Sequence, residues 1–173
     1  MANKHYNQVR EFHKAFNYKQ ADEPTPISTD VVVKRTNYLL EEIVELLFAS
    51  SGGEEVLFDA LVDNLIENVY KEKEAVIKKS PDVSDKLVAQ LDALTDISYF
   101  NYGNFAIAGV EPENLFDVVH ESNMSKLDPE TGKPIYREDG KVLKGDGFIE
   151  PEPKLKEEIE LQKKRSSNPS GKM

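Results

Sequence analysis

Apolar residues recur with helical spacing through the first two-thirds of the chain. Val9, Phe12 and Phe16 lie three and four residues apart, which places them on one face of a short first helix. Pro24 and Pro26 follow, and proline removes a backbone donor that a helix interior needs. The pattern therefore predicts a short amphipathic helix followed by a proline-containing loop.

Longer apolar stripes follow, each bounded by residues that start or stop helices. Ser, Thr and Asp are common N-caps, whereas glycine and proline end helices. Four further helices are expected between 28 and 52, between 54 and 80, between 84 and 109, and from Glu111-Pro112 to about Lys126.

The pattern changes after Lys126. Asp139-Gly140 is a frequent two-residue hairpin turn, and the short segments beside it predict a hairpin at about 133–148. Residues 150–165 are charged and are expected to form one more exposed helix, with disorder from Ser166 onward. The expected fold is all-α, a four- to five-helix bundle with a small C-terminal β-hairpin appendage.

Length and composition limit the class of protein. The 173 residues predict one domain at 1–150, which includes the hairpin, and a charged, partly disordered tail at 151–173. A formal net charge of −10 argues against binding to a nucleic-acid polymer. The absence of cysteine excludes disulfides and thiol nucleophiles, and no apolar run approaches the ~18 residues of a membrane span. A cytoplasmic protein without a membrane segment is expected.

Three carboxylates crowd one sector of the second expected helix. At about 100° per residue, Glu41 and Glu45 lie about 40° apart, and Glu42 and Glu45 about 60° apart. The surrounding residues are mostly apolar, so at least one carboxylate is expected near buried surface, where a cation would offset its desolvation.

The fourth expected helix carries a second acidic pair. Asp92 and Asp96 are also i, i+4, in an equally apolar stretch, and in an antiparallel bundle they could face the first cluster. Oxygen ligands of this kind suit Mg²⁺ or Mn²⁺ better than zinc. The alternative is a pair of ordinary solvated helix faces, and spacing alone leaves the two interpretations about equal.

Other polar residues extend this picture. Tyr99 and Gly103 continue the face of Asp96, so Tyr99 could reach a bound ligand or could simply pack. The run Ser122-Asn-Met-Ser-Lys126 could cap the fifth helix or bind phosphate. No histidine follows a glutamate at the Glu-x-x-His spacing of a di-iron site, so the histidines are expected to be structural.

These residues resemble a known family. Glu41-Glu42-x-x-Glu45 followed by an acidic helix is similar to the E-E-x-x-E…E-x-x-D signature of the MazG-like all-α NTP pyrophosphatases. Three later segments of this chain resemble the phosphoribosyl-ATP pyrophosphohydrolase-like branch of that family. They are Asp92-Ala-Leu-x-Asp96-x-x-Tyr99-x-x-x-Gly103, Val119-His-x-Ser122-Asn-Met-Ser-Lys126 and Asp139-Gly-Lys141-Val…Lys144-Gly145. The resemblance covers about residues 6–150.

The resemblance implies an activity and a set of metal ligands. Members form helical dimers, sometimes tetramers, and hydrolyse a nucleoside triphosphate between the α and β phosphates with Mg²⁺, for which Mn²⁺ is a possible substitute. Glu42, Glu45 and Asp96 match metal ligands, and Glu41 matches the carboxylate that holds or deprotonates the attacking water. The role in the cell would be housecleaning of the nucleotide pool.

One position departs from the family pattern. The signature places Glu at position 93, where this chain has Ala, and Asp92 is the nearest substitute at about 100° around the helix. Asp92 would bind the metal directly or through a water. The substrate is expected to contact Arg35, Tyr99, Asn104, Asn123, Lys126, Lys141 and Lys144.

Two parts of the substrate have more specific expected contacts. Lys126, with Lys141 or Lys144, would hold the departing pyrophosphate, and Asn101 or Asn104 would read the base. The rival hypothesis is a non-catalytic acidic helical module that binds nucleotide or acts as an adaptor. Ala93 also leaves open a family member that has lost activity.

Overall fold

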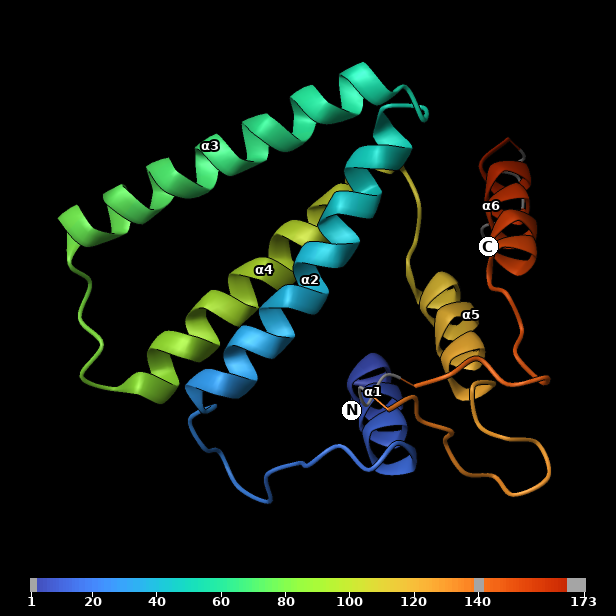
Figure 1. The fold of residues 1–173 in the computed structure, drawn as a ribbon. Coiled ribbons are helices and arrows are strands. Elements are labelled where there is room, and N and C mark those ends of the chain that lie inside the picture. The colour runs from blue at the N-terminus through green and yellow to red at the C-terminus, as the bar shows by residue number, and fades with distance from the viewer. Residues whose placement is uncertain (1–2, 139–141, 168–173) are drawn as a thin grey trace, which may run out of the picture. The chain divides into compact units, whose positions relative to one another are not determined.

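A computed structural model describes residues 3–138 and 142–167 of the chain. The described residues form α1 (Lys4–Ala15), α2 (Thr29–Ser50), α3 (Glu55–Lys79), α4 (Lys86–Ala108), α5 (Glu113–Met124) and α6 (Glu152–Ser167) (Figure 1). The all-α expectation is confirmed. The helices begin and end close to the expected positions, and the charged segment after 150 forms α6.

The expected β-hairpin is not present as strands in the described residues. Its pairing is limited to two isolated antiparallel bridges, Leu127 with Pro134 and Tyr136 with Val142. The Asp139-Gly140 turn lies outside the described residues. A two-stranded ribbon is marginal by itself, and this segment is also bonded to the end of α1, where the Tyr136 hydroxyl donates to the Phe16 carbonyl.

The chain divides into two compact units, which are described separately. One unit is Glu23–Thr95, and the other combines Met1–Asp22 with Asp96–Met173. The boundary therefore falls within α4. No described helix is both long and apolar enough to cross a membrane.

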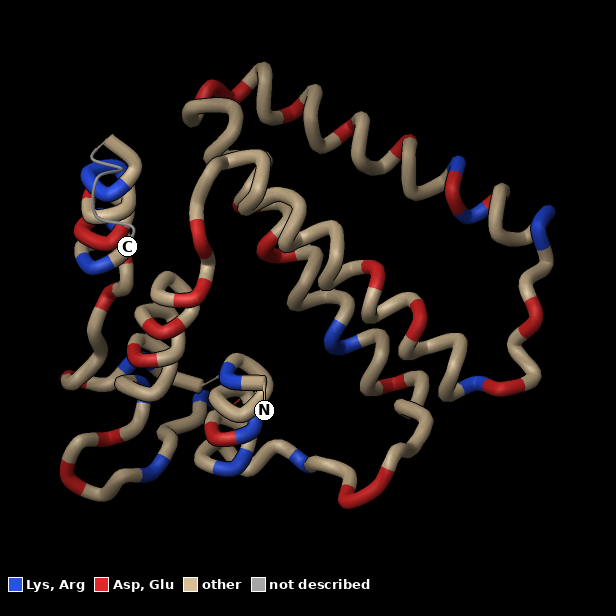
Figure 2. Tube along the Cα trace, turned by 180° about the vertical axis from the view of Figure 1, so that it is seen from behind, with Lys and Arg blue, Asp and Glu red and all other residues tan. Residues whose placement is uncertain are grey.

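The unit Glu23–Thr95 holds α2, α3 and the first part of α4. Between α2 and α3, Gly52 and Gly53 adopt positive φ angles of 64° and 80°, which side chains disfavour. The ring of Phe48 meets Phe58 edge to face at 5.3 Å across this turn. Acidic residues are spread along α3, and Lys78 and Lys79 lie in its last turn, where they complement the helix dipole (Figure 2).

Gln90 connects the beginning of α4 to the segment that precedes α2. Its side-chain oxygen accepts the Ile27 N–H at 2.8 Å, and its amide nitrogen donates to the Ile27 carbonyl at 2.9 Å. Both backbone groups of Ile27 are thereby satisfied by one side chain. The contact fixes the beginning of α2 beside the second turn of α4.

Contacts of α5 organise the other unit. On α1, Lys4 donates to Asp117 at 2.7 Å, and this bond lowers the pKa of the Asp117 carboxyl. On α6, Lys154 pairs with Glu121 at 2.7 Å. The Tyr136 hydroxyl donates to the carbonyl of Phe16 at 2.6 Å, which ties the segment after α5 to the end of α1.

Few apolar side chains are buried. Phe16, at 2% exposure, is the one buried hydrophobic residue among those described. None of the apolar residues of Glu23–Thr95 is buried, and many of those on α2, α3 and α4 are exposed. Exposed apolar helix faces of this extent are typical of an interface rather than of a solvated surface.

Candidate active site

The expected carboxylate triad lies on one sector of α2. Glu41, Glu42 and Glu45 are all exposed, so the expectation that one of them lies near buried surface is wrong for this chain by itself. The reason is that the apolar residues around them are also exposed, including Ile43 and Leu46. The triad is a solvent-accessible anionic patch.

Arg35 lies on α2 before the triad. Its guanidinium carbon is 5.8 Å from the centre of the Tyr38 ring, and the nitrogen of Lys34 is 6.0 Å from the same centre. A cation–π contact at an exposed ring contributes about 0.5–1 kcal/mol. Arg35 is exposed, which leaves its charge accessible to a ligand.

The second acidic pair lies on an open face of α4. Asp92, Asp96, Tyr99 and Gly103 fall within about 60° around the helix. Tyr99 is 76% exposed, and a Cβ added to Gly103 would meet no atom within 4 Å. This face can therefore admit a ligand or another helix without rearrangement.

The carboxylates of the described residues do not converge into a cage. Among the described residues, no three His, Cys, Asp or Glu side chains gather closely enough to hold a metal ion. Mg²⁺ does not require such a cage, because it keeps several waters and commonly uses one or two carboxylates plus substrate phosphates. Oxygen-only donors at i, i+3 and i, i+4 spacing fit that ion.

The expected phosphate-binding residues partly come together after α5. Lys126 donates to the Asn123 amide oxygen at 2.7 Å, and its nitrogen is 6.0 Å from the centre of the Phe148 ring. The nitrogen of Lys144 is 4.2 Å from the same ring centre and pairs with Glu150 at 3.2 Å. Two cations from separate segments thus share one aromatic ring.

Ser122 and Ser125 have a structural role in this arrangement. Ser122 is buried, and its hydroxyl donates to the Ile149 carbonyl at 2.8 Å. The Ser125 hydroxyl accepts the Ile149 N–H at 2.9 Å and donates to the Ser122 carbonyl at 2.7 Å. The two serines hold the segment that carries Phe148 against the end of α5.

Phe148 and Ile149 were not expected from the sequence as parts of this cluster. Only their position after a glycine-containing stretch distinguishes them, and spacing does not reveal a contact to α5. Asn104 lies on α4 and is exposed, and Lys141 lies outside the described residues.

A separate cavity lies against α1, α4 and α5. It has a volume of about 610 Å³ and is lined mainly by apolar and aromatic side chains. Asn101, Tyr102 and Phe105 line it and lie between about 120° and 180° around α4 from Asp96. The cavity and Asp96 are therefore on different sides of α4, and Asn101 is poorly placed to read the base of a nucleotide held at Asp96.

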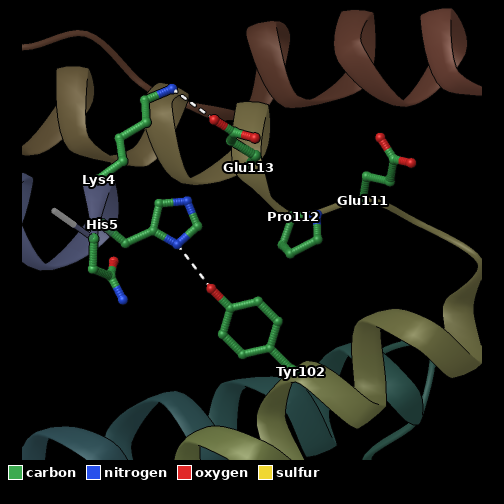
Figure 3. A pocket seen from close by; sticks show the side chains of 7 residues that line it. Lys4, His5, Tyr102, Glu111, Pro112 and Glu113 are labelled. Atoms are coloured by element: carbon green, nitrogen blue, oxygen red, sulfur yellow. Dashed lines mark hydrogen bonds and ion pairs between the residues drawn. The ribbon is translucent and has the colours of Figure 1, made fainter. Parts of the chain in front are cut away.

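His5 is part of the wall of this cavity. Its Nδ1 lies 2.8 Å from the Tyr102 hydroxyl, in a neighbouring pocket that Lys4, Glu111, Pro112 and Glu113 also line (Figure 3). Its ring stacks on Phe116 at 4.2 Å. His120 lies 3.4 Å from Glu11 and is largely covered. Both contacts agree with the expected structural role of the histidines.

Comparison with known proteins places these features in a family. The sequence matches the phosphoribosyl-ATP pyrophosphohydrolase family over residues 9–123, which includes both acidic clusters and Asn123. No curated protein matches the chain.

A solved structure is similar over nearly the whole chain. It is the 1.78 Å crystal structure of a candidate NTP pyrophosphohydrolase from Exiguobacterium sp. 255-15, with 40% identity and a TM-score of 0.86. The match covers 96% of this chain and 99% of that one. With the family match extending over most of the sequence, the chain belongs to the phosphoribosyl-ATP pyrophosphohydrolase family, within the MazG-like superfamily, and has a general pyrophosphohydrolase role.

Proposed function

We propose that this protein is a Mg²⁺-dependent nucleoside triphosphate pyrophosphohydrolase that serves housecleaning of the nucleotide pool. A water molecule adds to the α-phosphorus, the bond from that phosphorus to the α–β bridging oxygen breaks, and the products are a nucleoside monophosphate and pyrophosphate. The family match across both acidic clusters is the observation that carries the proposal.

Glu42, Glu45 and Asp96 are the proposed metal ligands, with Asp92 binding directly or through a water. When bound, Mg²⁺ or Mn²⁺ would neutralise the substrate phosphates and polarise the α-phosphorus. Glu41 shares the sector of α2 with the ligands and is the proposed acceptor of the proton that the attacking water loses.

The cations near Phe148 are the proposed binding group for the departing pyrophosphate. Lys126 and Lys144 bring two positive charges to one aromatic ring, and a pyrophosphate presents several anionic oxygens to such a pair. Lys141, Asn123, Arg35, Tyr99 and Asn104 remain proposed substrate contacts. Catalysis in this scheme comes from positioning and charge stabilisation, without a covalent intermediate.

The test is a substrate panel with identification of the products. The purified protein is incubated with canonical and modified nucleoside triphosphates and with phosphoribosyl-ATP, each with and without Mg²⁺. Equal amounts of monophosphate and pyrophosphate are expected, and only with the metal. Release of orthophosphate and a diphosphate would contradict the proposed cleavage position.

Two variants separate catalysis from nucleotide binding alone. Glu42→Gln and Asp96→Asn are expected to lower turnover by at least ~100-fold while the helical circular dichroism is unchanged. Glu72→Gln and Asp63→Asn on α3 make the same chemical changes at residues outside the proposed ligand set and should keep full activity. Wild-type protein that binds nucleotide without hydrolysing it would support the non-catalytic alternative.

We also propose that the protein acts as a homodimer or a tetramer. The exposed apolar faces of α2, α3 and α4 support this proposal, because a monomer would leave them in water. Sedimentation velocity on the wild-type protein tests it directly.

A further inference from the structure

The cavity of about 610 Å³ lies wholly within the unit that combines Met1–Asp22 with Asp96–Met173. None of the proposed metal ligands or substrate contacts lines it. Pockets that bind small molecules commonly have volumes of about 300–1,000 Å³, with a mainly apolar lining and a few polar groups. The cavity has this size and this kind of lining, and the proposed reaction does not use it.

One face of α4 forms a wall of the cavity. Ser98, Asn101, Tyr102 and Phe105 have the i, i+3, i+4, i+7 spacing of a single helix face, and all four line the cavity. No described residue hydrogen-bonds to the side-chain amide of Asn101. An amide with both donor and acceptor groups therefore lines a mainly apolar cavity without a protein partner.

His5 and Tyr102 form a flat aromatic surface in the same cavity. Their ring planes differ by 17°, the ring centres are 6.5 Å apart, and His5 Nδ1 lies 2.8 Å from the Tyr102 hydroxyl. The two rings therefore lie end to end, not one above the other (Figure 3). Phe116 stacks on His5 at 4.2 Å, whereas Tyr102 is 50% exposed. The Tyr102 ring is thus accessible to a planar ligand.

The charges in the neighbouring pocket favour a ligand without a phosphate group (Figure 3). Lys4 lines this pocket, but its ammonium group is already paired with Glu113 at 3.3 Å and with Asp117 at 2.7 Å. Glu111 and Glu113 line the same pocket. Carboxylates repel a phosphate, whereas they accept hydrogen bonds from the hydroxyl groups of a ribose. An uncharged sugar therefore fits this pocket better than a sugar phosphate.

We propose that the cavity binds a neutral nucleoside, with the base stacked on Tyr102 and hydrogen-bonded to the Asn101 amide. An Asn side chain pairs with the edge of a base, and best with adenine, whereas stacking on an aromatic ring tolerates any base. The ribose hydroxyls donate to Glu111 or Glu113. A nucleoside contains no phosphoric anhydride, so it occupies this site as an effector and not as a substrate.

Calorimetric titration with nucleosides tests the site. The wild-type protein is titrated with adenosine, guanosine, cytidine and uridine in the absence of Mg²⁺, so that neither a phosphate nor a metal contributes to binding. One nucleoside should bind per chain, most tightly adenosine, with a Kd between about 10 μM and 1 mM, as expected for one stacking contact and a few hydrogen bonds. Absence of saturable binding for all four nucleosides would overturn the proposal.

Matched variants on α4 locate the bound nucleoside. Tyr102→Leu and Asn101→Ala should each raise the Kd for adenosine about 5-fold or more, through loss of the stacking contact or of the bonds to the base. Tyr99→Leu and Asn104→Ala make equivalent changes at proposed substrate contacts outside the cavity lining, and should leave that Kd unchanged. The opposite pattern, or no effect of the first two variants, would overturn the site.

The Asn101 variant keeps the test valid if Tyr102→Leu does not fold. Asn101 is exposed and bonds to no described residue, so Asn101→Ala should retain the wild-type circular dichroism. Adenosine binding by a protein that hydrolyses no triphosphate would leave the nucleoside site standing while the proposed function fails. The two failures are distinguishable because the titrations contain no anhydride.

Competition and sedimentation identify the occupant. Adenosine 5′-monophosphate without Mg²⁺ should compete with bound adenosine about 5-fold more weakly than adenosine itself, as one like-charge contact near the surface implies. A monophosphate that competed equally well would contradict the preference for a neutral ligand. If a second copy of the chain covered the cavity instead, adenosine would not bind and Tyr102→Leu would change the sedimentation coefficient. That result would also overturn the proposal.

Discussion

The hydrogen bond between Ser122 and Ile149 provides a quantitative test of how the segment after α5 is held. Ser122 is 5% exposed, and its hydroxyl donates to the Ile149 carbonyl at 2.8 Å. Ser122→Ala removes this donor. A hydrogen bond of this kind contributes about 0.5–1.5 kcal/mol net, so the free energy of unfolding should fall by about 1 kcal/mol.

The expected change is measurable by thermal unfolding. For a chain of this size, 1 kcal/mol corresponds to roughly 2–4 °C in the midpoint. Ser50→Ala is the matched control, because the Ser50 hydroxyl is exposed and donates only to Leu46 within the same helix. The control should remain within about 0.5 kcal/mol of the wild type, and it calibrates the higher helix propensity of alanine.

The measurements must use one protein concentration, because association makes the midpoint depend on concentration. Adding Ser125→Ala to the first change removes the remaining side-chain partner of Ile149, and should approximately double the loss. A Ser122→Ala protein as stable as the Ser50→Ala control would refute the contribution of this bond.

Other parts of the structure give further expectations. Phe148→Leu removes the ring beside Lys126 and Lys144, and should raise the KM for a triphosphate about 2- to 5-fold. Phe148→Tyr keeps an aromatic ring and should leave the KM unchanged. Equal steady-state kinetics for the two variants would contradict the role of the ring. The bond from Lys4 lowers the pKa of Asp117 in the folded state, so its stabilisation is present above the unfolded pKa of about 4 and is lost as the pH falls through the lower folded value. Asp117→Asn should therefore be less stable than the wild type in urea titrations at pH 7, by a difference that disappears in acid. A difference that persisted at low pH would mean that packing, not charge, holds this contact.

Local sequence signals predicted the helices well, because helix boundaries depend on nearby residues. Ser28 precedes α2, Glu54 precedes α3, and Gly109 follows α4, close to the helix boundaries expected from the sequence. Pro112 is the N-cap of α5, which begins one residue after the expected Glu111-Pro112 start. The hairpin expectation was less successful, because two short segments need support that a turn signal does not provide.

The acidic spacing on α2 and α4 also follows from sequence alone. Residues four apart in a helix share a face whatever surrounds the helix, so the grouping of Glu41 with Glu45 and of Asp92 with Asp96 needed no coordinates. The family match across these residues supports the same activity class.

Only the tertiary structure decided how these groups relate to the rest of the molecule. Helical periodicity specifies a face but not the direction of a neighbouring helix. In the structure, α2 and the first part of α4 run in the same direction, with Gln90 bonded to Ile27 near the beginning of both (Figure 1). Likewise, Phe148 meets Lys126 and Lys144 through bonds between Ser122 and Ile149, which lie 27 residues apart. Contacts at such separation depend on how the chain packs, and no local pattern in the sequence encodes them.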